Sequence, residues 1–408
     1  MAKLKDFIVK SIIGNTDQNY KMGDSSFDTQ DYVFLETFDE LKNQDVLDRC
    51  VDASDYAIIN GVFVEFEVKN SKMFTSYWLR TAYDNNYVYS NGENGEINGD
   101  FDYYPSDDNK MWSNVIWKNR NGICPALHLN LSSVISAQKT ENKFKIEPVL
   151  DEKGKVLYHT IQFGSYPQDK VKKTMAERLE KLFLEYTLNP LTLTGKKYLG
   201  FCSIEQKNTQ NPEVELYGKK YVRVVSKNSV YDLVNKTGAN APVIETPMWV
   251  EVKPIKWVIK NWDELPTELN PNGNGTAETI YVRTEKVLIT GIPFNPRCSK
   301  IETPEYSMWQ NSPIRAFLNG YNLYEELKNG NGNIKFKASK NFNYKGKSFL
   351  NEAFDEDVNT ELTLKNQHDK NSLSPAEIAR NELIKKALER RKQAQQVNNK
   401  DDQNENVL

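Results

Sequence analysis

MWVEVKPIKWVI, from Met248 to Ile259, and AETIYVRTEKVLITGI, from Ala277 to Ile292, are rich in Val, Ile and aromatic residues. Such side chains favour extended backbone because they pack well on a pleated surface. KKYVRVV (219–225) and YHTIQFGSYPQ (158–168) have the same character, and the second is expected to end in a turn at Pro167. These four stretches predict a sheet in the second half of the chain.

Two helices are expected beside these strands. MAERLEKLFLEYTL (175–188) follows the first of them. SPIRAFLNGYNLYEEL (312–327) begins with Ser312 as N-cap and Pro313 at the first helical position. Its Ile314, Phe317 and Leu318 recur at helical spacing, which predicts that they face a core.

The first half of the chain mixes the same two element types. YVFLETFDEL (32–41) indicates a strand that runs into a helix. Residues 77–104 alternate tyrosines and contain Asn-Gly turns, which is typical of hairpins. ICPALHLNL (123–131) alternates apolar residues along a strand, and Pro125 fixes the approach to it. The predicted fold class is therefore α+β.

The ends of the chain differ from its middle, and four segments are predicted: a leader (1–24), two globular segments (25–150 and 155–355) and a charged tail (356–408). The leader MAKLKDFIVKSIIGN fits either an amphipathic helix or a short strand through residues 7–9. It is not a secretory signal, and no stretch reaches the ~20 apolar residues of a membrane span. The tail predicts a C-terminal helix at 374–396, with Ser374 and Glu377 as a capping box, and a disordered end.

The charge and the cysteine content indicate the cellular compartment and limit the classes of partner. The net charge is -3, from 53 basic and 56 acidic residues, so no overall field favours nucleic acid or an anionic membrane. KFKASKNFNYKGKSF (335–349) suits single-stranded nucleic acid locally, but a basic hairpin with inward-facing aromatics is the favoured interpretation. Four dispersed cysteines indicate free thiols in a reducing compartment, with disulfides as the alternative, and the expected location is cytoplasmic.

Known catalytic motifs are absent from the sequence. The chain has three histidines, His128, His159 and His368, and no HExxH pair. It also lacks a GxSxG elbow, a P-loop and a GxGxxG that follows a strand. We therefore expect no enzyme of these familiar classes and no cofactor.

Six short motifs resemble a bacterial family of domains of unknown function. FGSYPQ (163–168), PIKWVI (254–259) and SPIRAFLNG (312–320) are similar to its first half, F-G-x-Y-P-Q, P-I-x-W and S-x-I-R-x-F-L-N. Three others are similar to its second half, F-L-x-S-x-x-E, W-W-L-R-S and R-P-A-L-x-L: FLETFDEL (34–41), YWLRT (77–81) and CPALHL (124–129). The halves occur in swapped order here, which implies either a circular permutation or two partial copies side by side.

Departures from the pattern are Tyr77, Thr81 and Cys124, where the family has Trp, Ser and Arg. The W-L-R…P-A-L half is also similar to the C-type-lectin-like fold of formylglycine-generating proteins. This resemblance implies a mixed α/β body that presents surface loops for binding. It assigns structural roles to four motif residues: Trp78, Arg80, Pro125 and Arg315.

The acidic, aromatic loop NGDFDYYPSDDN (98–109) is the candidate binding surface. Its clustered oxygens suit calcium, but they lack the spacing of an EF-hand, and a solvated acidic loop is the favoured interpretation. Exposed aromatics would stack on a sugar or on a protein, whereas buried ones would be core. The candidate contact residues are Tyr87, Tyr89, Asp100, Asp102, Tyr103 and Tyr104.

The sequence thus favours a binding or assembly protein that contacts a protein or glycan. An enzyme with an unfamiliar site is the first alternative, built from two or more of Arg80, Arg315, His128 and Cys124 in one pocket. A structural component of a phage or mobile element is the second. If the motif halves form one body, Trp78 and the helix at Ile314–Leu318 share a continuous core.

Overall fold

The computed structural model describes residues 3–14, 28–44, 49–62, 64–67, 72–82, 88–91, 97–99, 121–141, 144–188, 198–199, 202–205, 213–216, 218–225, 247–292, 294, 308–323, 325 and 343–354. These residues belong to one compact unit, Ala2–Glu356. The predicted tail helix, 374–396, lies outside them. None of the helices in these ranges has the length and apolar composition that crossing a bilayer requires.

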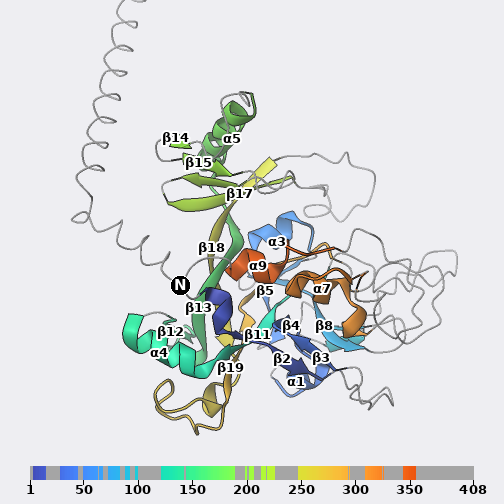
Figure 1. Cartoon of the computed structure of the whole chain (residues 1–408), viewed down its shortest axis with the longest axis vertical. Helices are drawn as coiled ribbons and strands as arrows, with labels where there is room; N and C mark the ends of the chain where they lie inside the picture. Colours follow the sequence, from blue (N-terminus) through green and yellow to red (C-terminus); the bar gives the residue numbers. More distant parts are fainter. Residues whose placement is uncertain are drawn as a thin grey trace, which may run out of the picture. The chain divides into compact units, whose positions relative to one another are not determined.

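Two long antiparallel strands, β13 (Val156–Lys170) and β18 (Pro247–Ile259), form the centre of the main sheet (Figure 1). The opposite edge of β18 is shared by two partners. Its first half pairs with β17 (Lys219–Val225), and its last three residues pair with β19 (Thr279–Thr284). The sheet therefore branches at β18, and all four strands predicted in the second half are confirmed.

The predicted turn at Pro167 is wrong, because β13 continues through this residue to Lys170. Bulges interrupt the pairing with β18 between Gln162 and Ser165 and between Pro167 and Asp169. On its other side β13 pairs with β12 (Ile146–Leu150) only up to Ile161. A proline, which has no N–H to donate, is tolerated where a strand has one unpaired edge or a bulge.

One branch of the sheet brings distant parts of the chain together. β19 pairs with β11 (Ala126–Asn130), whose other edge pairs with both β1 (Ile8–Val9) and β4 (Val33–Phe34). The strand alternative for the leader is thus confirmed at Ile8–Val9, after a 3-10 turn, η1, at Leu4–Phe7. Strands from both predicted globular segments lie in one sheet.

The other branch continues from β17 through β16 (Glu213–Leu216), β15 (Cys202–Glu205) and β14 (Tyr198–Leu199). The other described strands form three smaller sheets. The predicted hairpins are confirmed as β8 (Tyr77–Ala82), β9 (Val88–Asn91) and β10 (Ile97–Gly99). The remaining strands are β2 (Ser11–Ile13) with β3 (Thr29–Asp31), and β20 (Lys286–Val287), β5 (Asp52–Ala53), β7 (Lys72–Thr75) and β6 (Val64–Glu67).

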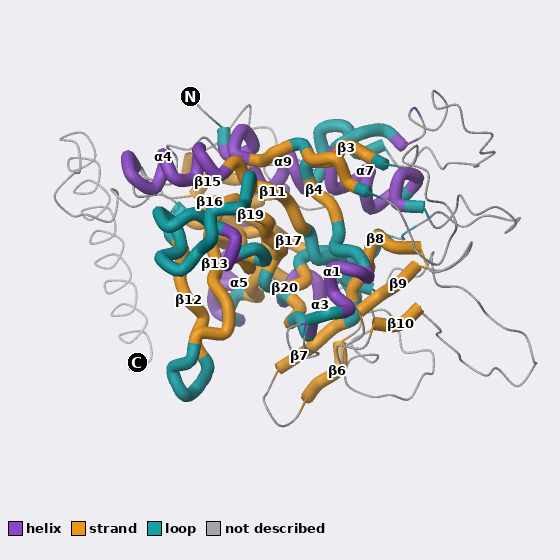
Figure 2. Tube along the Cα trace, turned by 90° about the horizontal axis from the view of Figure 1, so that it is seen from below, coloured by secondary structure: helices purple, strands orange, loops and turns teal. Residues whose placement is uncertain are grey.

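Helices and antiparallel strands together make the predicted α+β class (Figure 2). The helices are α1 (Phe38–Lys42), α3 (Asp55–Ile59), α4 (Leu131–Glu141), α5 (Lys173–Leu188), α7 (Pro313–Asn319) and α9 (Phe349–Phe354).

One predicted strand and one predicted helix have other bounds than the sequence suggested. The strand through ICPALHLNL ends at Asn130, because α4 begins at Leu131. α7 has the predicted Ser312 cap but ends at Asn319, since Gly320 adopts the left-handed conformation (φ 80°) that terminates helices.

The basic stretch at 335–349 was interpreted as a strand and hairpin with inward-facing aromatics. Of its aromatics, Tyr344 and Phe349 are described, and both pack inward. Tyr344 contacts the ring of Phe317 at a centroid distance of 5.4 Å, and Phe349 is fully buried. The prediction of a hairpin is wrong at the end of this stretch, because Phe349 begins the helix α9.

α7 attaches to the N-terminal part of the chain through one of its faces. The Arg315 guanidinium donates from Nε to Oδ1 of buried Asp31 at 2.8 Å. Asn319, four residues later and hence on the same face, donates from Nδ2 to the Val33 carbonyl at 2.7 Å and accepts from the Val33 amide at 3.0 Å. Arg315 and Asn319, both in the SPIRAFLNG motif, thus hold β3 and β4 next to α7.

Trp78 and α7 belong to one continuous core, as predicted. The buried Trp78 ring lies 5.9 Å from the ring of Phe294, which lies 6.3 Å from the ring of Trp309. The Ser312 hydroxyl, the cap of α7, donates to the Phe294 carbonyl at 2.7 Å. The YWLRT and SPIRAFLNG motifs therefore contribute to a common interior, whatever order they have along the chain.

Candidate functional site

The predicted ligand surface is almost entirely outside the described residues. This applies to Tyr87, Asp100, Asp102, Tyr103 and Tyr104. The backbone of Tyr89 is described, opposite Gly99 in the β9–β10 pair, but its side chain is not. Among the described residues no group of three or more His, Cys, Asp or Glu side chains could hold a metal ion. The loop surface and its calcium site remain predictions.

A different site is present where α1, β11, β18 and β19 approach one another. It is a pocket of about 450 Å³, and its walls are mostly polar. The loop that follows β18 closes one side of it. The lining residues are Glu40, Gln44, His128, Lys260, Asn261, Glu264, Thr276, Ala277, Glu278, Thr279 and Tyr281.

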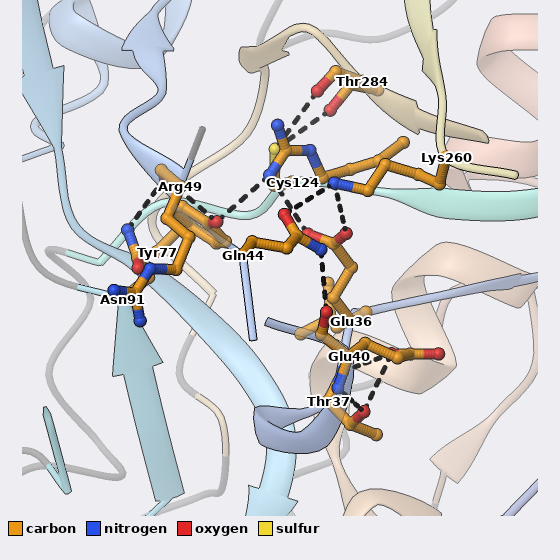
Figure 3. Close-up of polar contacts among 12 residues, drawn as sticks. Glu36, Thr37, Glu40, Gln44, Arg49, Tyr77, Asn91, Cys124, Lys260 and Thr284 are labelled. Carbon is orange, nitrogen blue, oxygen red and sulfur yellow. Dashed lines mark hydrogen bonds and ion pairs between the residues drawn. The ribbon is translucent and has the colours of Figure 1, made fainter. Parts of the chain in front are cut away.

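Beside the pocket lies a buried ion-pair network centred on Glu36 (Figure 3). Its Oε2 atom accepts from Nη1 of Arg283 at 3.1 Å, and its Oε1 atom lies 3.5 Å from Nζ of Lys260. Lys260 also donates to Oε1 of Gln44 at 2.9 Å. Because Lys260 and Gln44 line the pocket, the network fixes part of the pocket wall.

The network keeps its charges despite burial. Burial alone would raise the pKa of Glu36, but the positive charges of Arg283 and Lys260 hold it below its ordinary value. Burial would likewise lower the pKa of Arg283, and the Glu36 carboxylate raises it instead. Both groups therefore remain ionised at neutral pH, as a buried pair must if neither partner is to be left uncompensated.

Glu40 is placed at the pocket by the start of α1. Thr37 and Glu40 form a capping box, in which the Glu40 amide donates to the Thr37 hydroxyl at 3.1 Å and the carboxylate accepts from the Thr37 amide. Arg80 donates to the Leu35 carbonyl and, at 3.4 Å, to Oε2 of Glu40. Arg80 thus binds a carbonyl and a carboxylate.

Two aromatic rings, His128 and Tyr281, supply the flat part of the wall. They meet edge to face with centroids 5.1 Å apart, and the Nδ1 atom of His128 lies 2.7 Å from the Ser11 hydroxyl. Burial lowers the pKa of His128, partly opposed by Glu40, so the imidazole is neutral at pH 7. The Tyr281 hydroxyl is buried and has no hydrogen-bond partner in the described part of the chain.

Asn261 holds the loop at the rim of the pocket. Its Nδ2 atom donates to the Thr279 carbonyl at 2.9 Å, and its Oδ1 atom accepts from the Tyr281 amide at 2.9 Å. The exposed side chains of Glu264 and Glu278 lie on this rim, and neither has an ion-pair partner among the described residues. The rim therefore presents two carboxylates to solvent.

The four residues considered for an enzyme do not gather in this pocket. Only His128 lines it, whereas Arg315 is bound to Asp31. Cys124 is a buried free thiol 3.2 Å from the Thr284 hydroxyl, and burial raises its pKa, which disfavours the reactive thiolate. Pro125 is buried directly before β11.

Sequence reasoning missed Glu36, Lys260, Arg283 and Tyr281. A partial signal existed, because Arg283 interrupts the apolar strand IYVRT and charged residues are rarely buried unless paired. The partner could not be found from sequence, since Glu36 lies 247 positions away. No protein-family model matches the chain, and no match was found among curated proteins or solved structures.

Proposed function

We propose that this protein binds a small, hydroxyl-rich ligand of the saccharide class in the pocket between α1, β11 and β19. The observation that carries the proposal is the composition of the wall. Carboxylates, amides and hydroxyls stand beside the rings of His128 and Tyr281. Planar polar groups bind sugar hydroxyls, and aromatic rings pack against the apolar faces of sugars, so this mixture suits a saccharide.

Preorganisation supports the same function. Lys260 and Gln44 are fixed by the Glu36 network, and Asn261 fixes the rim loop through two backbone contacts. Side chains that are already held lose little freedom when a ligand binds. The sequence predicts a protein or glycan partner at the loops of residues 87–104. The pocket offers a second location for this kind of contact, and a lectin-like or permuted scaffold remains part of the proposal.

Titration calorimetry of the full chain with a panel of mono- and disaccharides tests this function. Thr276→Phe fills the pocket and is expected to weaken binding at least about tenfold, which is roughly 1.4 kcal/mol. Thr140→Phe is the matched control, because Thr140 is also an exposed threonine and lies on α4, outside the pocket lining. Binding that survives Thr276→Phe, or a panel without a ligand, would refute the proposal.

A further inference from the structure

The charges around the pocket indicate the class of saccharide more closely. Of the lining residues, Glu40, Glu264 and Glu278 carry carboxylates, and Lys260 is the cation. His128 is neutral at pH 7 because burial lowers its pKa. Three carboxylates against one ammonium make the pocket lining net negative.

Lys260 does not offset them, because its charge is already used within the protein. Its ammonium lies 3.5 Å from the buried Glu36 carboxylate and 2.9 Å from Oε1 of Gln44. Glu40 is likewise engaged, by the capping box of α1 and by Arg80. The exposed pair that remains is Glu264 and Glu278, which have no cationic partner in the described ranges.

A second feature is the aromatic surface of Tyr281. Its ring meets that of His128 edge to face at a centroid distance of 5.1 Å, and both residues line the pocket. The Tyr281 hydroxyl itself is buried without a hydrogen-bond partner among the described residues, so a ligand in the pocket meets the ring and not this oxygen. Aromatic rings pack against the apolar faces of sugars, so this side of the pocket suits the sugar ring.

We propose that the ligand is an amino sugar, whose ammonium group lies at Glu264 and Glu278 and whose ring packs on the Tyr281 side of the pocket. This inference rests on the proposed saccharide function. An ammonium group donates hydrogen bonds to carboxylates with the added attraction of opposite charge, and these are stronger than bonds between neutral groups. A neutral sugar of the same shape gains none of this attraction.

The test compares D-glucosamine with D-glucose by titration calorimetry of the full chain, at a mildly acidic pH at which the amine is protonated. We expect glucosamine to bind at least about tenfold more tightly at low salt, and added salt to reduce the difference, because exposed charges are screened. In Glu264→Gln/Glu278→Gln the shape is kept and the preference is expected to vanish. Glu268→Gln, an exposed residue of the same loop outside the pocket lining, should leave it unchanged.

The outcomes separate the two proposals. Equal affinity for both sugars, lost on Thr276→Phe, would leave the saccharide function standing and overturn the amino-sugar preference. A preference that persists in the double glutamine variant would also overturn it. If neither sugar binds and the wider panel contains no ligand, both proposals fail.

Discussion

Glu36 is almost completely buried, and its carboxylate connects three neighbouring parts of the main sheet. It follows β4, and it binds Arg283 of β19 and Lys260 at the end of β18. Arg283 also donates to the Tyr77 hydroxyl of β8 at 3.2 Å. Such a pair adds less to stability than its Coulomb energy suggests, because both charges lose their hydration. Removing one partner is costly, since the other charge stays buried.

Glu36→Gln is therefore expected to destabilise the protein by about 3–5 kcal/mol, because Arg283 loses its counter-charge in a buried site. Urea denaturation followed by circular dichroism measures the loss. Glu36→Gln/Arg283→Met should lose less than the sum of the two single variants, since each alone already breaks the same pair. Additive losses would show that the two charges do not depend on each other.

The two described histidines predict a pH dependence of the folding stability. Burial lowers the pKa of His128 and of His159 below the ordinary value of 6.5. Between that value and the folded pKa, these histidines bind more protons in the unfolded chain, so they make the free energy of unfolding fall as the pH falls. Glu352, whose pKa burial raises to about 7, contributes a slope of the opposite sign in the same range. His128→Gln should flatten this slope more than His159→Gln, because His128 is the more buried of the two. Urea denaturation of the parent and of both variants at a series of pH values measures the slopes, and a His128→Gln slope equal to that of the parent would contradict this role of His128.

At the scale of elements, α9 packs on β13 where Gly164 leaves room for it. Gly164 has φ +68°, and a Cβ atom there would lie 2.5 Å from Cε1 of Phe354 and 2.8 Å from the Ala353 carbonyl oxygen. The rings of Phe163 and Phe354 stack beside it with centroids 5.3 Å apart. Only glycine combines this backbone conformation with so close an approach of a helix.

Gly164→Ala is expected to destabilise the protein more than Gly154→Ala. Gly154 is the matched control because it has φ +79° but nothing within 4 Å of its Cβ position. The control should cost about 1–2 kcal/mol for the left-handed conformation alone. The excess in Gly164→Ala measures the contact with α9 in thermal or urea unfolding. Equal losses would mean that α9 does not pack there.

Local patterns predicted most elements because they depend on residues close in sequence. The Val- and Ile-rich stretches became β17, β18 and β19, and the Ser312 cap began α7. Pro167 misled because its turn signal is local, whereas the unpaired edge of β13 that tolerates it is a property of the sheet. The pocket was missed for the same reason, since its parts are brought together only by strand pairing across the whole chain.

In the whole molecule, the two halves of the chain share one sheet and bind each other through side chains. β11 from the first half pairs with β19 from the second, and Arg315 and Asn319 of α7 bind Asp31 and Val33. The turn between β12 and β13 lies at the junction of the two halves, and Glu152–Lys155 within it are exposed.

A protease site inserted between Lys153 and Gly154 should therefore be cut without separating the halves. We expect the two fragments to co-elute on size exclusion in native buffer and to separate in denaturant, because sheet pairing and the buried Glu36–Arg283 pair hold them together. An uncut chain with the same insertion is the control. Two folded fragments that elute apart in native buffer would show two independent bodies.

A crystal structure of the full chain with D-glucosamine would show directly whether the pocket beside Glu36 binds an amino sugar. We expect sugar density in the pocket, with the ammonium at Glu264 and Glu278 and the sugar ring against the Tyr281 side. Sugar density at residues 87–104 with the pocket filled by water alone would contradict it.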